Sequence, residues 1–373
     1  MNKSFAKNIK TTKGDALLII AVTLLSIIGT IFIYSASRYS ALKTYGDALY
    51  FVKKQIVGIV LGVIAMIVLG NIDFMKLKKI CPYLSIISIV LLLLIFVPGL
   101  GVENYGARRW IKVGPITIQP SEISKLALIL FCATYASRDK TNPKKFKGIL
   151  PILSYGGLTC LLIMLEPNMS ITVCVAMLTI SMAFISGARI KTLLMLGVPL
   201  VVGAIVLIII EPYRLNRLMA FINPWSNPKG EGYQLLQSLY ALGSGGWFGV
   251  GLFNSRQKYA FLPFAESDFI LSVIGEEIGF IGLFFFFALI GFIIYRGLRI
   301  ASKTNNFFGF CLSVGITLIF AIQAIVNALV VTGSIPPTGL PLPLVSSGNT
   351  SIIIFMSEMG VLYNVSKSNS LTF

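Results

Sequence analysis

The chain has 373 residues, of which 56% are hydrophobic and 12% charged, and its mean hydropathy is +0.86. Soluble domains carry about 25% charged residues, so this composition excludes an ordinary water-soluble enzyme. The 31 Lys and Arg outnumber the 14 Asp and Glu, and in so apolar a chain this surplus favours anionic membrane lipids as partners over nucleic acid.

Long apolar runs follow one another along the chain. At about 20 apolar residues per membrane crossing, the composition supplies roughly ten spans. We therefore predict an all-α polytopic membrane protein that forms a single transmembrane domain over residues 1–373. Hydropathy places the spans at 16–35, 55–71, 83–101, 122–137, 149–165, 169–187, 191–211, 267–295, 306–332 and 347–365.

Segments between the spans lie alternately on the same face of the membrane as the N-terminus and on the opposite face. Lys and Arg are denser in the segments on the face of the N-terminus, which predicts that both termini are cytoplasmic. The outer face then carries a long loop between spans seven and eight, about 212–266, and a shorter one, about 102–121. The positive charges in these outer loops indicate an anionic ligand, or simply follow from the free translocation of long loops.

No histidine is present, which removes the usual general base and the commonest metal ligand, so acid–base chemistry depends on carboxylates, Lys, Tyr or water. The five cysteines have no CxxC spacing and lie in or beside apolar runs, so we interpret them as buried free thiols. The glycine-rich segment 243–251 follows no strand, so no nucleotide cofactor is predicted, although its amides could hold a phosphate.

Acidic residues lie where the long loop enters the eighth span. Ser267 or Asp268 could cap that helix, or Asp268 could act as a general base beside a lipid-borne substrate. Glu266 is the nearest rival for the role of base.

Charged residues also lie inside predicted spans, where they are expensive and therefore functional candidates. Glu122 and Lys125 are three residues apart on one helix face and could pair, either lining a polar cavity or forming a structural ion pair. Glu276 and Glu277 lie two to three turns into the eighth span, so at least one must face the protein interior. Gly58 and Gly62 predict a close helix contact, and the prolines of 334–343 predict an irregular loop packed on protein.

Taken together, these stretches resemble the SEDS family (shape, elongation, division and sporulation), and the FtsW/SpoVE branch more than RodA. The resemblance covers nearly the whole chain in the same order. Its motifs are Gly106–Ile111, Gln119–Glu122 with Lys125, Pro224–Trp225, Gly230–Gln234, Gln237–Ser238, Gly243–Gly246, Asn254–Lys258, Leu262–Pro263, Asp268–Ile270, Gly275–Glu277 and Thr338–Pro343.

The resemblance implies a ten-helix peptidoglycan glycosyltransferase of the bacterial cytoplasmic membrane, acting in cell division, cell shape or sporulation. Such an enzyme polymerises lipid II into glycan strands at the outer face, usually with a class B penicillin-binding protein as transpeptidase. The family's essential aspartate falls on Asp268. The substrate-binding residues that the resemblance suggests are Arg109, Glu122, Lys125, Arg217, Gln234, Ser238 and Lys258, with Glu266 and Glu277 as supporting residues or alternative bases.

Two departures from the family pattern bear on the site. Glu266 stands where the family usually has a histidine, and its charge would raise the pKa of Asp268. Asn168 replaces the family's aspartate, so Glu166 or Glu122 must pair with Lys125.

We expect an inverting glycosyl transfer in which Asp268 deprotonates a sugar hydroxyl, and cationic residues, with Mg²⁺ or Mn²⁺ as a candidate cofactor, stabilise the departing pyrophosphate. The alternatives are a lipid II flippase and a noncatalytic scaffold that recruits a transpeptidase. A flippase needs polar residues through the full membrane depth, whereas the candidate charges cluster towards the outer side.

Overall fold

The structure is a computed structural model that describes residues 14–104, 107–113, 116–138, 143–195, 197–198, 203, 212–259 and 261–369. Within these residues, six helical stretches are long and apolar enough to cross a membrane: 16–45, 50–71, 74–94, 146–165, 270–302 and 307–331. The seventh predicted span, 191–211, lies mostly outside the described residues.

Each of the other predicted spans falls on a helix, although the boundaries differ by several residues. The helices are α1 (Ala16–Tyr45), α2 (Tyr50–Asn71), α3 (Leu77–Leu94), α4 (Pro120–Ala136), α5 (Phe146–Leu165), α6 (Met169–Ile185), α10 (Ile270–Ser302), α11 (Phe307–Val331) and α12 (Asn349–Asn369).

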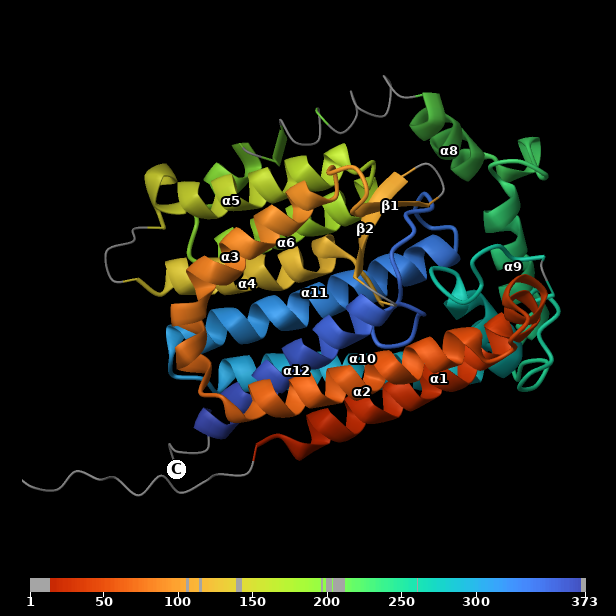
Figure 1. The fold of residues 1–373 in the computed structure, drawn as a ribbon, viewed down its shortest axis with the longest axis horizontal. Helices are drawn as coiled ribbons and strands as arrows, with labels where there is room; N and C mark the ends of the chain where they lie inside the picture. The colour runs from red at the N-terminus through yellow and green to blue at the C-terminus, as the bar shows by residue number, and fades with distance from the viewer. Residues whose placement is uncertain are drawn as a thin grey trace, which may run out of the picture.

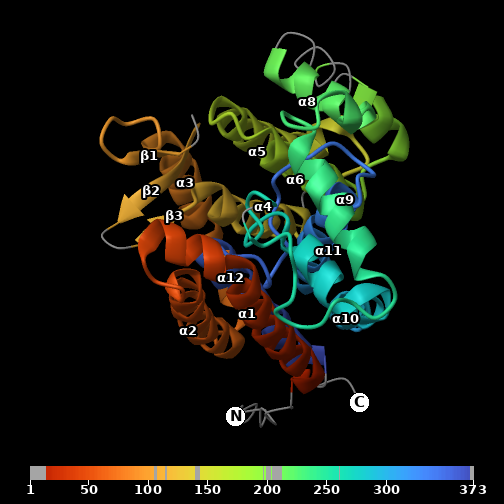
Figure 2. The same cartoon turned by 90° about the vertical axis from the view of Figure 1, so that its right-hand side faces the viewer.

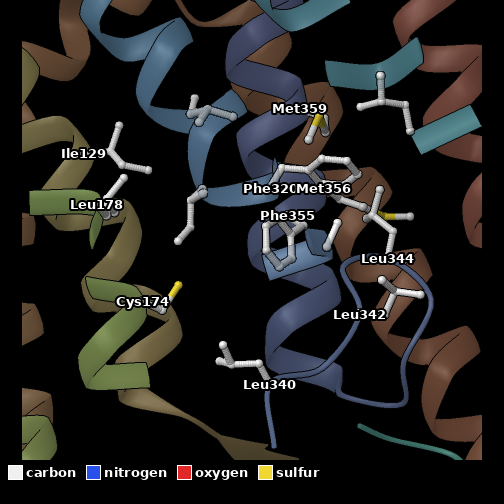
Figure 3. Close-up of a cluster of buried hydrophobic side chains, with 14 of the residues drawn as sticks. Ile129, Cys174, Leu178, Phe320, Leu340, Leu342, Leu344, Phe355, Met356 and Met359 are labelled. Carbon is white, nitrogen blue, oxygen red and sulfur yellow. The ribbon is translucent and has the colours of Figure 1, made fainter. Parts of the chain in front are cut away.

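The long helices run roughly along one direction, with α11 between a group formed by α3–α6 and a group formed by α1, α2, α10 and α12 (Figure 1). Helix α11 contacts α4, α6, α10 and α12, which explains why so much of it is buried. Side chains of α4, α6, α11, α12 and the loop before α12 meet in one buried apolar cluster (Figure 3).

Helix α12 also packs closely along α2. A Cβ at Gly58 would lie 2.7 Å from the Ile352 side chain, and one at Gly62 would lie 2.6 Å from the sulfur of Met356. The predicted close helix contact is confirmed, because a larger residue at either glycine would force the side chain of Ile352 or Met356 to move. The described cysteines are free thiols, as predicted.

The predicted all-α fold missed a small sheet. Strands β1 (Gly101–Asn104), β2 (Ala107–Val113) and β3 (Ile116–Ile118) form an antiparallel sheet in the order β1-β2-β3, within the segment predicted as a short loop. Strands this short give almost no hydropathy period to detect. Thr350 at the start of α12 accepts from the amide of Gln119 and donates to the carbonyl of Thr117, which ties the sheet to the helices.

The long connection between 212 and 269 contains α8 (Pro212–Ile222), a 3₁₀ turn (Pro224–Ser226) and α9 (Tyr233–Gly245). These elements, the sheet and the start of α10 lie at one end of the molecule (Figures 1 and 2), called the loop end below. Helix α9 packs on α10.

Helix α10 is interrupted at Gly279, where φ is +66°. Across this break the segment 246–251 pairs with the α10 backbone: Val250 and Gly251 donate to the carbonyls of Glu276 and Glu277, while Phe280 and Ile281 donate to those of Gly246 and Trp247. A Cβ at Gly249 would overlap the carbonyl of Glu277. The possibility that the glycine-rich amides hold a phosphate is wrong for Val250 and Gly251, because both already bond to α10.

The opposite end brings the two ends of the described chain together and is called the terminal end below. Asp15, before α1, forms an ion pair with Arg296 near the end of α10. The amide of Asp15 also donates to the hydroxyl of Ser366 near the end of α12, at 2.8 Å.

Candidate functional site

The segment from Phe264 to Asp268 leads into α10 at the loop end. It begins with a tight turn, in which Phe264 has a φ of +56° and its carbonyl accepts from the amides of Ser267 and Phe269. The N-cap residue of α10 is Phe269, and no side chain caps the helix. The capping interpretation of Ser267 and Asp268 is therefore wrong, and another reason is needed for a carboxylate here.

The backbone of this segment is held at three consecutive carbonyls. The carbonyl of Glu266 accepts from the amide of Ser347 at 2.9 Å, and that of Ser267 accepts from the hydroxyl of Ser346 at 2.6 Å. The carbonyl of Asp268 accepts from the side-chain amide of Asn327, in α11, at 2.8 Å. Groups from α11 and from the loop before α12 therefore fix the backbone while leaving the carboxyl group of Asp268 for other contacts.

The Asp268 side chain is half-buried. Its Oδ1 atom accepts from the hydroxyl of Ser267 at 2.7 Å, and Gly339, with a φ of +70°, lies next to Oδ2, since a Cβ there would be 3.6 Å from it, an ordinary van der Waals contact. Burial raises the pKa of Asp268 above its ordinary value, and the Ser267 hydroxyl and the charge of Arg217 partly oppose this. A carboxylate with a raised pKa is a better proton acceptor, as a general base requires.

Glu266 is also half-buried, and its pKa is raised mainly by burial and further by the charge of Asp268. Two carboxyl groups that repel each other when charged thus lie next to the start of α10. Arg217, in α8, is partly exposed and lies 3.9 Å from Glu231, and its charge reaches Asp268. Asp268 thus interacts electrostatically with both Glu266 and Arg217.

Glu122 and Lys125 pair, as their spacing predicted, at 2.7 Å. Lys125 Nζ also donates to Oε1 of Gln323 in α11 at 2.6 Å and lies 5.5 Å from the ring centroid of Phe355. Both charged side chains are 1% exposed, so their placement favours a structural ion pair over direct contact with substrate. The other candidate partner of Lys125, Glu166, is not its salt-bridge partner.

A second buried pair joins the long loop to α1 and α10. Lys258 Nζ lies 3.2 Å from Oε1 of Glu277, which also accepts from the hydroxyl of Ser35. Glu276 accepts from the hydroxyl of Ser255 and from the amides of Arg256 and Gln257. Both glutamates face the protein interior, so their placement favours anchoring the loop over acting as a base, and that of Lys258 favours anchoring over binding substrate.

Arg109, in β2, lies beside the turn between α5 and α6. It donates to the carbonyls of Glu166 and Pro167 and remains partly exposed. Glu166 is 1% exposed, and neither of its carboxyl oxygens has a hydrogen-bond partner among the described residues. Burial raises the pKa of Glu166 to about 8, with the charge of Arg109 opposing it.

Gln234 and Ser238 lie on α9. Gln234 donates to the carbonyl of Pro263 at 3.3 Å and keeps some exposure, so it reaches the segment that carries Asp268. Ser238 is fully buried and bonds to Ser272 in α10 and to the carbonyl of Val331 in α11. Its placement favours joining three helices over contact with substrate.

An open apolar pocket of about 890 Å³ lies between α6, residues 190, 193–194 and 197–198, and α11, and Asp268 does not line it. Its walls suit a hydrocarbon, but no carboxylate or amide lines it, so we place the chemistry at the loop end. Among the described residues, no three Cys, Asp or Glu side chains gather closely enough to hold a metal ion.

Sequence reasoning missed Asn327, Ser346 and Glu358. Glu358, in α12, is 1% exposed, and the charge of Lys125 acts on it. A signal existed for Asn327, because Gln323 and Asn327 are two amides four residues apart in an otherwise apolar helix, and buried polar groups require partners.

Residues 15–371 match the family model for FtsW, RodA and SpoVE, described as cell cycle proteins. The chain is 40% identical to stage V sporulation protein E of Bacillus subtilis, over 96% of this chain and 98% of that protein. It is 37% identical to a probable peptidoglycan glycosyltransferase FtsW of Trichlorobacter lovleyi, over 96% of this chain and 95% of that one.

Solved structures share the fold. A chain of a peptidoglycan synthase complex that coordinates polymerization and crosslinking superposes with a TM-score of 0.80 at 24% identity, covering 95% of this chain and 98% of that one. The rod shape determining protein RodA of Thermus thermophilus superposes with a TM-score of 0.70, also at 24% identity, covering 95% and 97%. By its matches along nearly its whole length, the chain belongs to the FtsW/RodA/SpoVE (SEDS) family and to its FtsW/SpoVE branch.

Proposed function

We propose that the chain is a peptidoglycan glycosyltransferase that polymerises lipid II into glycan strands at the outer face of the bacterial cytoplasmic membrane. Relatives that match nearly the full length carry this activity in their names. The observation that carries the proposal is a half-buried Asp268 whose backbone is fixed, whose carboxyl group remains available and whose pKa is raised by burial.

In the proposed reaction, Asp268 accepts the proton of the acceptor sugar's 4-hydroxyl. The hydroxyl oxygen forms a bond to the anomeric carbon of the donor sugar, and the bond from that carbon to the pyrophosphate oxygen breaks. The polyprenyl pyrophosphate leaves with the electron pair, so no protonated acid is needed, and the anomeric configuration inverts. Glu266 keeps a second carboxyl group near the base, and burial together with the charge of Asp268 raises the pKa of Glu266.

The departing pyrophosphate requires positive charge nearby. Arg109 and Arg217 suit this role, since each lies at the loop end with part of its side chain exposed. Gln234, partly exposed beside Pro263, is placed to contact a sugar or phosphate oxygen. Lys125, Glu122, Ser238, Lys258 and Glu277 support the site from inside the protein.

Mg²⁺ or Mn²⁺ stays a candidate cofactor, because Mg²⁺ is commonly held by one or two carboxylates together with substrate phosphates, and Asp268 and Glu266 would supply the carboxylates. Among the described residues no three acidic or thiol side chains gather into a site made of protein ligands alone, so no step of the proposed reaction is assigned to a metal.

The membrane arrangement proposed here has about ten spans, cytoplasmic termini and the 212–266 loop outside. It is supported by the apolar helices, by the joining of Asp15 to Ser366 at the terminal end, and by the location of α8 and α9 at the other end (Figure 1). A class B penicillin-binding protein is the proposed partner, in line with the synthase complex whose chain shares this fold.

The decisive experiment supplies purified lipid II in detergent to the wild type, Asp268→Asn and Asp47→Asn proteins, each with the transpeptidase partner. Asp47 is an exposed aspartate paired with Lys53, and its variant is the matched control. We expect polymer from the wild type and the control and none from Asp268→Asn. Undiminished polymer from Asp268→Asn would refute the base assignment. Without polymer from any of them, but with lipid II transport across vesicles, the flippase alternative would stand.

A further inference from the structure

We propose that two buried amides of α11, Gln323 and Asn327, together with Ser346, form a positioning device that holds Asp268 in its reactive geometry and links it to the buried Lys125. This inference rests on the function proposed above. It assigns a task to residues that lie far from Asp268 in sequence, and it gives Lys125 a role that requires no contact with substrate.

The contact between Asn327 and Asp268 is the first observation. Asn327 is 1% exposed, and its Nδ2 atom donates to the carbonyl of Asp268 and to the carbonyl of Leu340, each at 2.8 Å. Both amide hydrogens are used, so a single side chain joins α11 to Asp268, two residues before α10, and to the proline-rich loop before α12. Losing this donor would leave two carbonyls without their partner.

Gln323 extends the device one turn deeper. It lies four residues before Asn327 and therefore on the same face of α11. Its Oε1 atom accepts from Lys125 at 2.6 Å, and its Nε2 atom donates to the carbonyl of Pro341 at 3.4 Å. Because Pro341 follows Leu340 directly, the two amides hold adjacent residues of one loop, and Lys125 orients the lower amide.

Ser346 holds the same segment from the other side. Its hydroxyl donates to the carbonyl of Ser267 and accepts from the amide of Leu342, at 2.6 and 2.7 Å. The loop that the amides fix at Leu340 and Pro341 thus turns back and fixes the residue before Asp268. The contacts close into a ring. Helix α11, the loop before α12 and the segment Phe264–Asp268, called the base segment below, each bond to the other two.

The chemical reason for such a ring is the geometry of proton transfer. A general base must lie within hydrogen-bond distance of the hydroxyl it deprotonates, and a misplacement of about 1 Å can cost roughly a hundredfold in rate. Asp268 precedes the helix and receives no support from helical hydrogen bonds, so its position depends on bonds to its neighbours.

The test compares Asn327→Ala and Ser346→Ala with Thr332→Val as the matched control. Thr332 also lies at the loop end of α11, but its hydroxyl bonds to Ala328, Leu329 and Ser334 and not to the base segment. Each protein is measured, with its partner, for kcat and KM with lipid II, for the pH dependence of kcat, and for thermal unfolding in detergent.

We expect kcat to fall about 10- to 100-fold in each test variant, with KM within about twofold of the wild type. The acid limb of the pH profile should move to lower pH, because a loosened segment admits water and relieves the burial that raises the pKa of Asp268. The control should match the wild type. A purely structural role would lower the folded fraction without moving the pH profile of the protein that remains folded.

The link to Lys125 is tested with Gln323→Met. We expect a smaller loss of kcat in the same direction, and a Gln323→Met/Asn327→Ala double variant that loses less than the product of the two single losses, because both act on one loop. Fully multiplicative losses would overturn the link.

The outcomes separate this inference from the proposed function. If Asp268→Asn abolishes polymerisation while Asn327→Ala and Ser346→Ala retain wild-type kcat, the positioning device is refuted and the base assignment stands. If Asp268→Asn retains activity, the proposed function itself fails. Should Asn327→Ala not fold, Ser346→Ala alone decides, because it removes a different bond to the same segment.

Discussion

Two aspartates that precede helices, one at each end of the molecule, are used in opposite ways. At the terminal end, both carboxyl oxygens of Asp15 make structural hydrogen bonds. Oδ1 caps α1 by accepting from the amide of Leu18, and Oδ2 accepts two hydrogen bonds from Arg296. At the loop end, Asp268 is held through its backbone carbonyl, and Ser267 is the hydrogen-bond donor to its carboxyl group among the described residues.

The difference separates structural from reactive carboxylates. Glu276 and Glu277 resemble Asp15, since each accepts several hydrogen bonds from the loop they anchor. These hydrogen bonds engage both carboxyl oxygens of Glu276 and one of Glu277. Asp268 has a raised pKa and an available oxygen, so it can accept a proton from a substrate.

The largest expected effect comes from neutralising each of the two aspartates in turn. Asp268→Asn should lower kcat by about 10²–10⁴-fold, the usual contribution of a general base, with little change in thermal unfolding. Asp15→Asn should leave kcat of the folded protein unchanged but destabilise it by about 1–3 kcal/mol, because Arg296 loses a charged partner. Activity assays and melting curves on both proteins check this, and the reverse pattern would break the comparison.

A stability effect of similar size is expected at the second buried pair. Lys258→Met should leave Glu277 buried without its cation and cost about 3–5 kcal/mol. Adding Glu277→Gln should recover most of that loss. Thermal unfolding in detergent measures both steps. A changed KM for lipid II at an unchanged melting temperature would instead show that Lys258 contacts the substrate.

Glu166 provides a pH-dependent test. Its ordinary pKa of 4.5 is raised to about 8 in the folded protein, so the folded state retains a proton that the unfolded chain releases. Stability from this group is therefore complete below about pH 4.5 and is lost as the pH rises towards 8. Melting temperatures at pH 5 and pH 8 should differ less in Glu166→Gln than in the wild type; equal differences would contradict the assignment.

The smallest effect is expected at Glu266. Glu266→Gln removes a carboxyl group whose own pKa is raised by burial and by the charge of Asp268, so it places little charge on Asp268, and the acid limb of the kcat profile should move by less than about one unit. Maximal kcat should stay near that of the wild type. A collapse of kcat would identify Glu266, instead of Asp268, as the base.

Local patterns predicted much of this molecule. Long apolar runs predicted the helices, a three-residue spacing predicted the Glu122–Lys125 pair, and glycines four apart predicted the contact of α2 with α12. Each of these features depends on residues that are close together in the sequence, where the hydrophobic pattern is a strong signal.

Long-range bonds were not predictable in this way. The bond from Asn327 to Asp268 joins residues 59 apart, and that from Ser346 to Ser267 joins residues 79 apart. No local spacing encodes such a pairing. The prediction that Lys125, Lys258 and Ser238 bind substrate rested on the family resemblance, and burial, which depends on the whole fold, favours a supporting role for them.

The interruption of α10 at Gly279 has a consequence for engineering. Because segment 246–251 completes the backbone bonding of the helix around that glycine, the two stretches are one folding element divided between distant parts of the chain. A chimera that takes the 212–266 connection from a relative must therefore import residues 276–281 as well. A graft that ends at the start of α10 would pair segment 246–251 of one protein with residues 276–281 of another, and the backbone hydrogen bonds between them would not be matched.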